Sequence, residues 1–378
     1  MSENDGLWIE VDLAALRHNY REIKEKLAAS TRGIIAVVKA NGYGHGLLRT
    51  GLVLEEEGAA YLAVSHLGEG RLLRAGGVQC PILVMTPQRT ADYPAMIELA
   101  LIPTIDRIED LKALEKIATG REIAFHLKLN TGMNRFGLNR EEIDEFCRLL
   151  RQCPDLRLEA VFSHLATALS ENHPATTRQI ENFAADKRQI EAAIGRPVLA
   201  HLANSAGALA YPKSHYDFLR VGTLLYGQYP ASYLAGRLDL KNTWVAKARI
   251  ISTREVKPRA AIGYGGDCKA RRKMTLGVLP VGYRDGFGVQ PPLNNVTWRI
   301  FLRQAFRLFR NFVRKQSANH VLLEGKQLPV IGRIAMQTTI IDIGGADLKI
   351  GDVVEVPMRR IASSPSLQII YKDADTSI

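Results

Sequence analysis

The sequence predicts an α/β protein, with an N-terminal (β/α)8 TIM barrel over residues 8–237 and a mainly-β C-terminal domain over residues 238–378. Short apolar, β-branched runs alternate with longer amphipathic stretches through the first two thirds of the chain, which is the pattern of repeated βα units. The 378 residues exceed the usual span of one compact domain. Beyond about residue 238 the pattern changes to strands without long helices.

The candidate barrel strands are eight short apolar runs. They are Gly33–Lys39, Tyr61–Ser65, Pro81–Met85, Leu101–Ile105, Ile123–Leu129, Leu158–Ser163, Val198–Leu202 and Phe218–Gly222. These runs are apolar on both faces, as a parallel sheet covered by helices requires. The stretches between them carry helix signals, as in Asp12–Ala29, where apolar residues recur at helical spacing. A doubly wound open sheet would show the same alternation.

The placement of reactive side chains separates the two architectures. These side chains sit at or just after the C-terminal ends of several different predicted strands: Lys39, Lys128, Arg135, His164, Asn204, Ser205 and Arg220. In a TIM barrel those ends converge on one mouth. We therefore favour the barrel and expect the functional site at that mouth.

The C-terminal domain is predicted from alternating strands. They are Val245–Val256, Leu276–Tyr283, His320–Ile334, Thr338–Ile343 and Val353–Val356, and residues 1–7 are candidates to pair with them. A stretch at 297–319 interrupts the pattern with apolar and arginine residues at helical spacing, which predicts a basic amphipathic helix. We favour an added surface or dimer-packing helix, and peripheral membrane contact is the alternative.

Composition excludes several classes of protein. Hydrophobic residues make up 46% and charged residues 24%, as in ordinary soluble globular proteins. Six of the eleven excess positive charges lie between Arg299 and Lys315, so the net charge is a weak argument for nucleic-acid binding. The N-terminus has no basic, apolar leader, so we expect a cytoplasmic protein. The four cysteines lack metal-ligand or disulfide spacing, and no metal site is expected.

Lys39 stands in an unusual segment, VVKANGYGHG (Val37–Gly46), at the end of an apolar strand and before several glycines. From position alone, a surface lysine is the simpler interpretation. The functional interpretation is a Schiff-base lysine, because partial desolvation lowers an ammonium pKa and the neutral amine is the form that attacks an aldehyde.

VVKANGYGHG resembles the cofactor-lysine motif of the alanine racemase family. Further segments resemble that family in the same order: HLKLNTGMNRFG (126–137), FSHLA (162–166), HLANSAG (201–207), RVGTLLYG (220–227), GYGG (263–266), PVGYRDG (280–286) and GRIAM (332–336). The resemblance covers nearly the whole chain. It implies an isomerase that uses pyridoxal 5'-phosphate (PLP) to interconvert L-alanine and D-alanine for D-alanine biosynthesis. It also implies a homodimer whose active sites use both subunits.

The resemblance assigns two bases. Lys39 would hold PLP and face one side of the substrate Cα, and Tyr264 of the partner subunit would face the other side. Inversion removes a proton from one face and delivers one to the opposite face, so groups on both sides fit the task. In the family, a histidine and an arginine that match His164 and Arg220 lower the pKa of the tyrosine.

The resemblance to the family also implies the roles of the other site residues. Arg220 would donate to the pyridine nitrogen, which stays unprotonated because a guanidinium does not release its proton. The phosphate would be bound by Tyr43, Ser205, Gly222 and Thr223, with Asn204 among the cofactor-binding residues. Arg135 and the Met336 amide would hold the substrate carboxylate. Lys128 matches a lysine that is often carbamylated in the family and then orients Arg135.

The chain departs from the family pattern at Gln337, where the family commonly has aspartate, and no segment matches the tyrosine that narrows the substrate entrance. A serine or broad-specificity amino-acid racemase is therefore the alternative function. A barrel decarboxylase and a non-catalytic PLP-carrier protein are further alternatives. The carrier proteins resemble the barrel alone, so the C-terminal domain argues against them.

Overall fold

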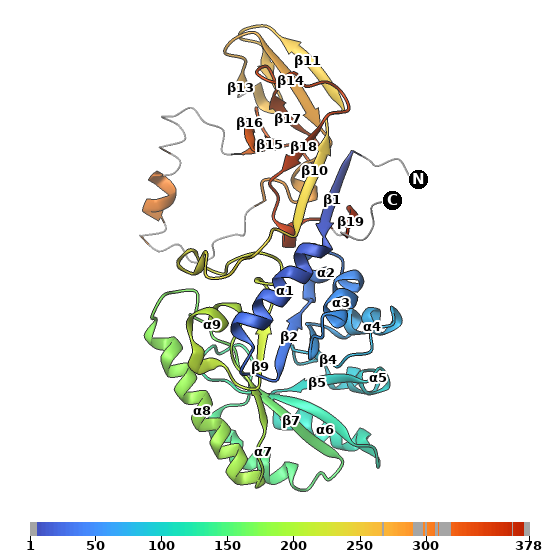
Figure 1. Ribbon diagram of the computed structural model, residues 1–378, viewed down its shortest axis with the longest axis vertical. Helices are drawn as coiled ribbons and strands as arrows, with labels where there is room; N and C mark the ends of the chain where they lie inside the picture. The colour runs from blue at the N-terminus through green and yellow to red at the C-terminus, as the bar shows by residue number, and fades with distance from the viewer. Residues whose placement is uncertain are drawn as a thin grey trace. The chain divides into compact units, whose positions relative to one another are not determined.

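The computed structural model describes residues 6–266, 268–289, 319–364 and 366–373, together with 298, 301–306 and 309. The chain divides into two compact units, one built on residues 12–243 and the other mainly on the residues before and after them (Figure 1). Each unit has its own sheets and is described separately below.

An eight-stranded parallel sheet forms the centre of the first unit, in the order β8-β7-β6-β5-β4-β3-β2-β9. Its strands are β2 (Gly33–Val37), β3 (Tyr61–Val64), β4 (Ile82–Val84), β5 (Leu101–Ile105), β6 (Ile123–Lys128), β7 (Leu156–Phe162), β8 (Leu199–His201) and β9 (Phe218–Val221). The two end strands, β8 and β9, contact each other. Across this seam the Arg220 amide donates to the Ala203 carbonyl at 3.0 Å. The predicted barrel is confirmed, and the open sheet is not observed in the described part of this unit.

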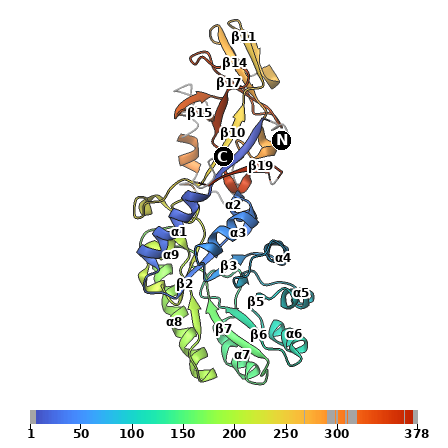
Figure 2. The same cartoon turned by 45° about the vertical axis from the view of Figure 1, so that its right-hand side comes forward.

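Helices follow the strands and pack on the outside of the barrel. They are α1 (Leu13–Leu27), α3 (Leu47–Glu56), α4 (Leu67–Ala75), α5 (Tyr93–Glu98), α6 (Ile108–Ala118), α7 (Ile143–Leu150), α8 (Pro174–Ile194) and α9 (Ser205–Ala210), with short 3-10 turns η1 (Thr90–Asp92), η2 (Arg140–Glu142), η3 (Pro212–Ser214) and η4 (Ser232–Leu234). The helices α4, α5 and α6 succeed one another down one side of this unit (Figure 2). In α1, Leu13, Leu16, Tyr20 and Ile23 are buried at helical spacing, and Asp12 caps the first turn by accepting from the Ala15 amide at 2.7 Å.

A left-handed turn follows β2. The segment α2 (Lys39–Gly44) has positive φ angles of 54°, 55°, 62° and 53° at Ala40, Asn41, Gly42 and Tyr43. Three of these residues are not glycine, and L-residues pay a steric cost in this conformation. The predicted strand through Lys39 is thus two residues too long, because β2 ends at Val37 and Lys39 begins the turn.

The second unit consists of three antiparallel sheets and short turns. The sheets have the orders β16-β15-β18-β10-β1-β19, β11-β14-β17 and β12-β13. The strands are β1 (Leu7–Asp12), β10 (Trp244–Arg249), β11 (Ser252–Val256), β12 (Ala261–Ile262), β13 (Cys268–Lys269), β14 (Met274–Leu279), β15 (His320–Leu323), β16 (Lys326–Pro329), β17 (Thr339–Asp342), β18 (Val353–Val356) and β19 (Gln368–Lys372), and the turns are η5 (Tyr264–Gly266), η6 (Tyr283–Asp285) and η7 (Arg360–Ala362). The predicted run at 245–256 is two strands, β10 and β11, that belong to different sheets. The predicted mainly-β domain is confirmed.

The predicted basic helix at 297–319 is described only in part. Residues 298, 301–306 and 309 are helical, and the other residues of that stretch lie outside the described residues. Within the described part of the chain, no helix combines the length and the apolar character needed to cross a membrane.

Candidate active site

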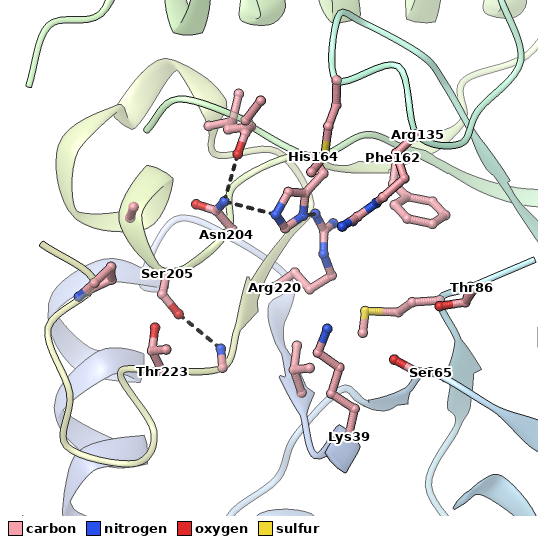
Figure 3. A pocket seen from close by; sticks show the side chains of 18 of the residues that line it. Lys39, Ser65, Thr86, Arg135, Phe162, His164, Asn204, Ser205, Arg220 and Thr223 are labelled. Atoms are coloured by element: carbon pink, nitrogen blue, oxygen red, sulfur yellow. Dashed lines mark hydrogen bonds between the residues drawn. The ribbon is translucent and has the colours of Figure 1, made fainter. Parts of the chain in front are cut away.

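A cavity of about 600 Å³ lies at the C-terminal ends of the barrel strands (Figure 3). Ten predicted site residues line it: Lys39, Tyr43, Lys128, Arg135, His164, Asn204, Ser205, Arg220, Gly222 and Thr223. The two remaining predicted residues, Tyr264 and Met336, belong to the other unit, where 73% and 54% of their surfaces are exposed.

The cavity is electropositive. Lys39, Lys128, Arg135 and Arg220 line it, and no acidic residue does so in the part of the chain that the structure describes. Burial, with help from Arg135, lowers the pKa of Lys39. Burial and the neighbouring Arg220 lower the pKa of Lys128 to about 8. The cavity therefore attracts anions and holds two amines with an increased neutral fraction.

Arg220 is buried beneath the cavity and held by four contacts. Its Nη1 lies 2.7 Å from Nδ1 of His201 and donates to the His201 carbonyl at 3.3 Å. Its Nη2 donates to the Ser163 carbonyl at 2.7 Å and lies 3.2 Å from Nδ1 of His164. A guanidinium has five N–H donors, so these contacts use the four on Nη1 and Nη2. Among the described residues, Nε–H has no hydrogen-bond partner and remains available to a ligand.

Because an arginine only donates, Nδ1 of His164 must accept from Arg220. Burial and the charge of Arg220 lower the pKa of His164 to about 3, so the ring is neutral and carries its proton on Nε2. Nε2 lies 3.4 Å from Nδ2 of Asn204. This amide is oriented by donating to the Leu165 carbonyl and accepting from the Gly207 amide, so it offers Nε2–H no acceptor.

A second corner of the cavity combines hydroxyl groups with a glycine. The Gly222 amide lies 3.0 Å from Oγ of Ser205, with Thr223 beside it (Figure 3). A Cβ at position 222 would stand only 2.6 Å from the hydroxyl oxygen of Tyr43. The Tyr43 ring stacks on Tyr226, with 4.8 Å between centroids. This close packing brings three hydroxyls and a backbone amide to one place, which suits a phosphate group.

Glu69 anchors the turn that carries Lys39. Its Oε1 accepts from the Ala40 amide at 2.7 Å, and its Oε2 accepts from the Ser65 amide at 2.8 Å. The carboxylate thus links the first left-handed residue to the end of β3. Its negative charge also acts to raise the pKa of Lys39, against the larger effect of burial.

Several residues around the cavity were not predicted. The lining also includes Ser65, Thr86, Met133, Phe136, Phe162 and Leu169. His126 and His201 lie buried below it, with Nδ1 of His126 3.0 Å from Nε2 of His201. Both histidines belong to segments already singled out in the sequence, HLKLNTG and HLANSAG. Their pairing could not be predicted because they lie on β6 and β8, which are separated by β7 in the sheet. Among the described residues, no group of three or more His, Cys, Asp or Glu is placed to hold a metal ion.

Comparison of the sequence with protein-family models and with known proteins finds the same family in each case. Residues 11–230 match the family description "Alanine racemase, N-terminal domain", and residues 244–377 match "Alanine racemase, C-terminal domain". An alanine racemase of Syntrophobacter fumaroxidans is 35% identical over 338 residues, which is 89% of this chain and 83% of that protein. An alanine racemase of Synechocystis is 35% identical over 354 residues, 92% of this chain and 88% of that one.

Solved structures agree. An alanine racemase of Clostridium difficile superposes with a TM-score of 0.86 at 27% identity, covering 98% of this chain and 96% of that chain. The biosynthetic alanine racemase of Pseudomonas aeruginosa superposes with a TM-score of 0.80 at 28% identity, covering 97% of this chain and 99% of that chain.

Proposed function

The chain belongs to the alanine racemase family, and from that premise we propose that it binds PLP and interconverts L-alanine and D-alanine. The observation that carries the proposal is that Lys39 and Arg220 extend into one cavity (Figure 3), where Nε–H of Arg220 has no hydrogen-bond partner among the described residues. This pair offers an amine for an aldehyde and a permanent N–H donor for a ring nitrogen.

The residues present fit PLP. When bound, PLP supplies an aldehyde that attaches to an amine and an aromatic ring that stabilises negative charge at the substrate Cα. Lys39 is the amine, and its lowered pKa favours the reactive neutral form. The phosphate would be held among Tyr43, Ser205, Gly222 and Thr223, and Asn204 lies beside His164 with its amide bound to the Leu165 carbonyl. Arg220 would donate to the ring nitrogen of PLP and leave it unprotonated, which would limit side reactions such as transamination.

Proton transfer at the substrate then needs one group on each face. Lys39 Nζ takes or returns the proton on its face of Cα. For the other face we propose Tyr264 of the partner subunit in a homodimer. His164 supports this assignment because its neutral ring presents an Nε2–H with no acceptor among the described residues, and such a donor stabilises a phenolate oxygen. Arg135 and the Met336 amide would hold the substrate carboxylate.

A serine or broad-specificity racemase is the second candidate. Gln337 replaces an aspartate of the family pattern, so a neutral amide stands where a negative charge is usual. A PLP carrier without catalysis is disfavoured because the chain also matches the C-terminal racemase domain over residues 244–377.

The test is direct. The purified protein is incubated with PLP and, separately, L-alanine, L-serine and L-lysine, and the enantiomers are resolved by chiral chromatography. We expect D-alanine to form fastest and Lys39→Ala to form none. Faster formation of D-serine would favour the second candidate, and pyruvate or an amine without any D-enantiomer would exclude racemisation.

A further inference from the structure

Arg220 is a buried cation, and no described residue places an anion directly beside it. Only 4% of its surface is exposed, and its partners among the described residues are two imidazole nitrogens and two carbonyl oxygens. Burial lowers its pKa to about 10. A buried charge normally needs a compensating charge close by. The positions of the protons on two buried histidines, His201 and His126, show where that compensating charge lies.

The direction of every proton in this row is fixed. Arg220 donates to Nδ1 of His201, so a neutral His201 carries its proton on Nε2. That proton points to Nδ1 of His126, 3.0 Å away. His126 therefore accepts at Nδ1 and carries its own proton on Nε2. Burial lowers the pKa of both rings, which keeps them neutral.

The row ends at Glu159. Nε2 of His126 lies 3.4 Å from Oε2 of Glu159, and among the described residues neither atom makes a well-aligned hydrogen bond. The Tyr61 hydroxyl also interacts with the Glu159 carboxylate. The contact with His126 lowers the pKa of Glu159, which is therefore a carboxylate. All the donors in the row point away from Arg220 and toward this negative charge.

A bulge in the sheet places Glu159 there. Phe125 pairs with Leu158, but the next residue, His126, pairs with Ala160, so Glu159 is the extra residue between β6 and β7. Bulges redirect a side chain out of the regular alternation and are frequent next to active sites. The other carboxylate oxygen of Glu159, Oε1, lies 3.6 Å from Nη2 of Arg157.

We propose that Glu159, acting through His126 and His201, is a positioning residue that supplies the countercharge of Arg220 and fixes its guanidinium against the ring nitrogen of PLP. This inference rests on the proposed function for its catalytic meaning. Removal of the negative charge weakens His201 as an acceptor, since polarisation along hydrogen-bonded groups is cooperative. Arg220 would then be held less rigidly against the ring nitrogen of PLP, that nitrogen would become easier to protonate, and side reactions would increase.

The experiment compares the wild-type holoenzyme with Glu159→Gln, Glu159→Asp and the matched control Glu122→Gln. Glu122 also pairs with Arg157, at 2.7 Å, but does not touch the histidines. We expect Glu159→Gln to lower kcat about tenfold with little change in KM and to shift the absorption spectrum of bound PLP. The fraction of turnovers that end in pyridoxamine phosphate should rise by a similar factor. For Glu159→Asp, kcat and the fraction of turnovers ending in pyridoxamine phosphate should lie between those of Glu159→Gln and wild type. Glu122→Gln should match wild type in both.

Two further measurements keep the inference testable. In a double-mutant cycle with Arg220→Lys, the effects of Glu159→Gln should be non-additive, whereas general destabilisation would be additive. If Glu159→Gln does not fold, His126→Asn replaces it, and we expect the same shift in the absorption spectrum of bound PLP. A wild-type protein that binds PLP but racemises no amino acid refutes the proposed function. An unchanged PLP spectrum and unchanged partition in folded Glu159→Gln refute this inference.

Discussion

The Glu69 carboxylate accepts a 2.7 Å hydrogen bond from the amide of Ala40, the residue immediately after Lys39. Ala40 is the first of five consecutive residues with positive φ, three of which are not glycine. Strained backbone of this kind persists only where its surroundings hold it in place. Glu69 is one such restraint, because its second oxygen is tied to the Ser65 amide at the end of β3.

We therefore expect Glu69→Gln to misplace Lys39. The glutamine keeps one acceptor oxygen and presents an NH2 group to backbone amides that are themselves donors. The free energy of unfolding should fall by about 1–2 kcal/mol, and kcat should fall about tenfold. Thermal unfolding and racemisation kinetics measure the two effects. Glu98→Gln, at an exposed helix position, is the control. Lower stability with an unchanged kcat would mean that Glu69 does not position Lys39.

Gly222→Ala should weaken PLP binding. The new Cβ would lie 2.6 Å from the Tyr43 hydroxyl oxygen, and Tyr43 cannot yield easily because its ring stacks on Tyr226. Loss of a hydroxyl contact to a phosphate should raise the Kd for PLP about 10- to 100-fold. Titration of the apoprotein with PLP, followed by absorbance, gives the value. Gly68→Ala, where the Cβ meets no atom within 4 Å, should leave the Kd unchanged. Equal affinities in all three proteins would count against the phosphate site.

Lys128 should form a carbamate more readily than an ordinary lysine. Only the neutral amine reacts with CO2, and burial, the main cause, favours that form by lowering the pKa to about 8. About a tenth of the side chain is then neutral at pH 7, and most of it is neutral at pH 9. At a fixed CO2 pressure, a carbamate signal in ¹³C NMR should therefore increase between pH 7 and 9. It should be missing in Lys128→Ala, and its persistence there would assign it to another amine.

Tyr264→Phe should separate proton exchange from inversion. With Lys39 intact, the α-hydrogen of one alanine enantiomer should still exchange with D2O, while net conversion in both directions should fall at least about a hundredfold. Mass spectrometry measures the exchange of the α-hydrogen, and chiral chromatography measures the net conversion. Tyr216→Phe removes a phenol that packs on Phe183 and should behave as wild type. Full conversion by Tyr264→Phe in both directions would show that another group serves the second face.

The barrel and the main polar and charged residues of the cavity could be predicted from the sequence. The eight runs are short, apolar and regularly spaced, and parallel strands place their C-terminal ends together, so the convergence of Lys39, His164 and Arg220 follows from topology. The left-handed turn could not be predicted, because intrinsic preference argues against positive φ at Ala40 and Tyr43. Tertiary contacts override that preference, among them the Glu69 carboxylate.

The row behind Arg220 was missed for a different reason. Periodicity identifies His126 and Glu159 as strand residues but does not reveal the bulge that sets them side by side. A single register shift between β6 and β7 decides this contact, and register is not encoded locally in parallel strands. The tautomers of His126 and His201 follow only once Arg220 is known to be their neighbour.

The interior position of these groups has a consequence for protein engineering. Transplanting the loops that carry Lys39 and Gly222 onto another barrel would reproduce the visible rim of the cavity. A host without counterparts of His126, Glu159 and His201 on β6, β7 and β8 would bury a grafted arginine without the imidazole acceptor and the carboxylate that stand behind Arg220 here. A successful transplant would have to rebuild the inside of three strands before any loop was changed.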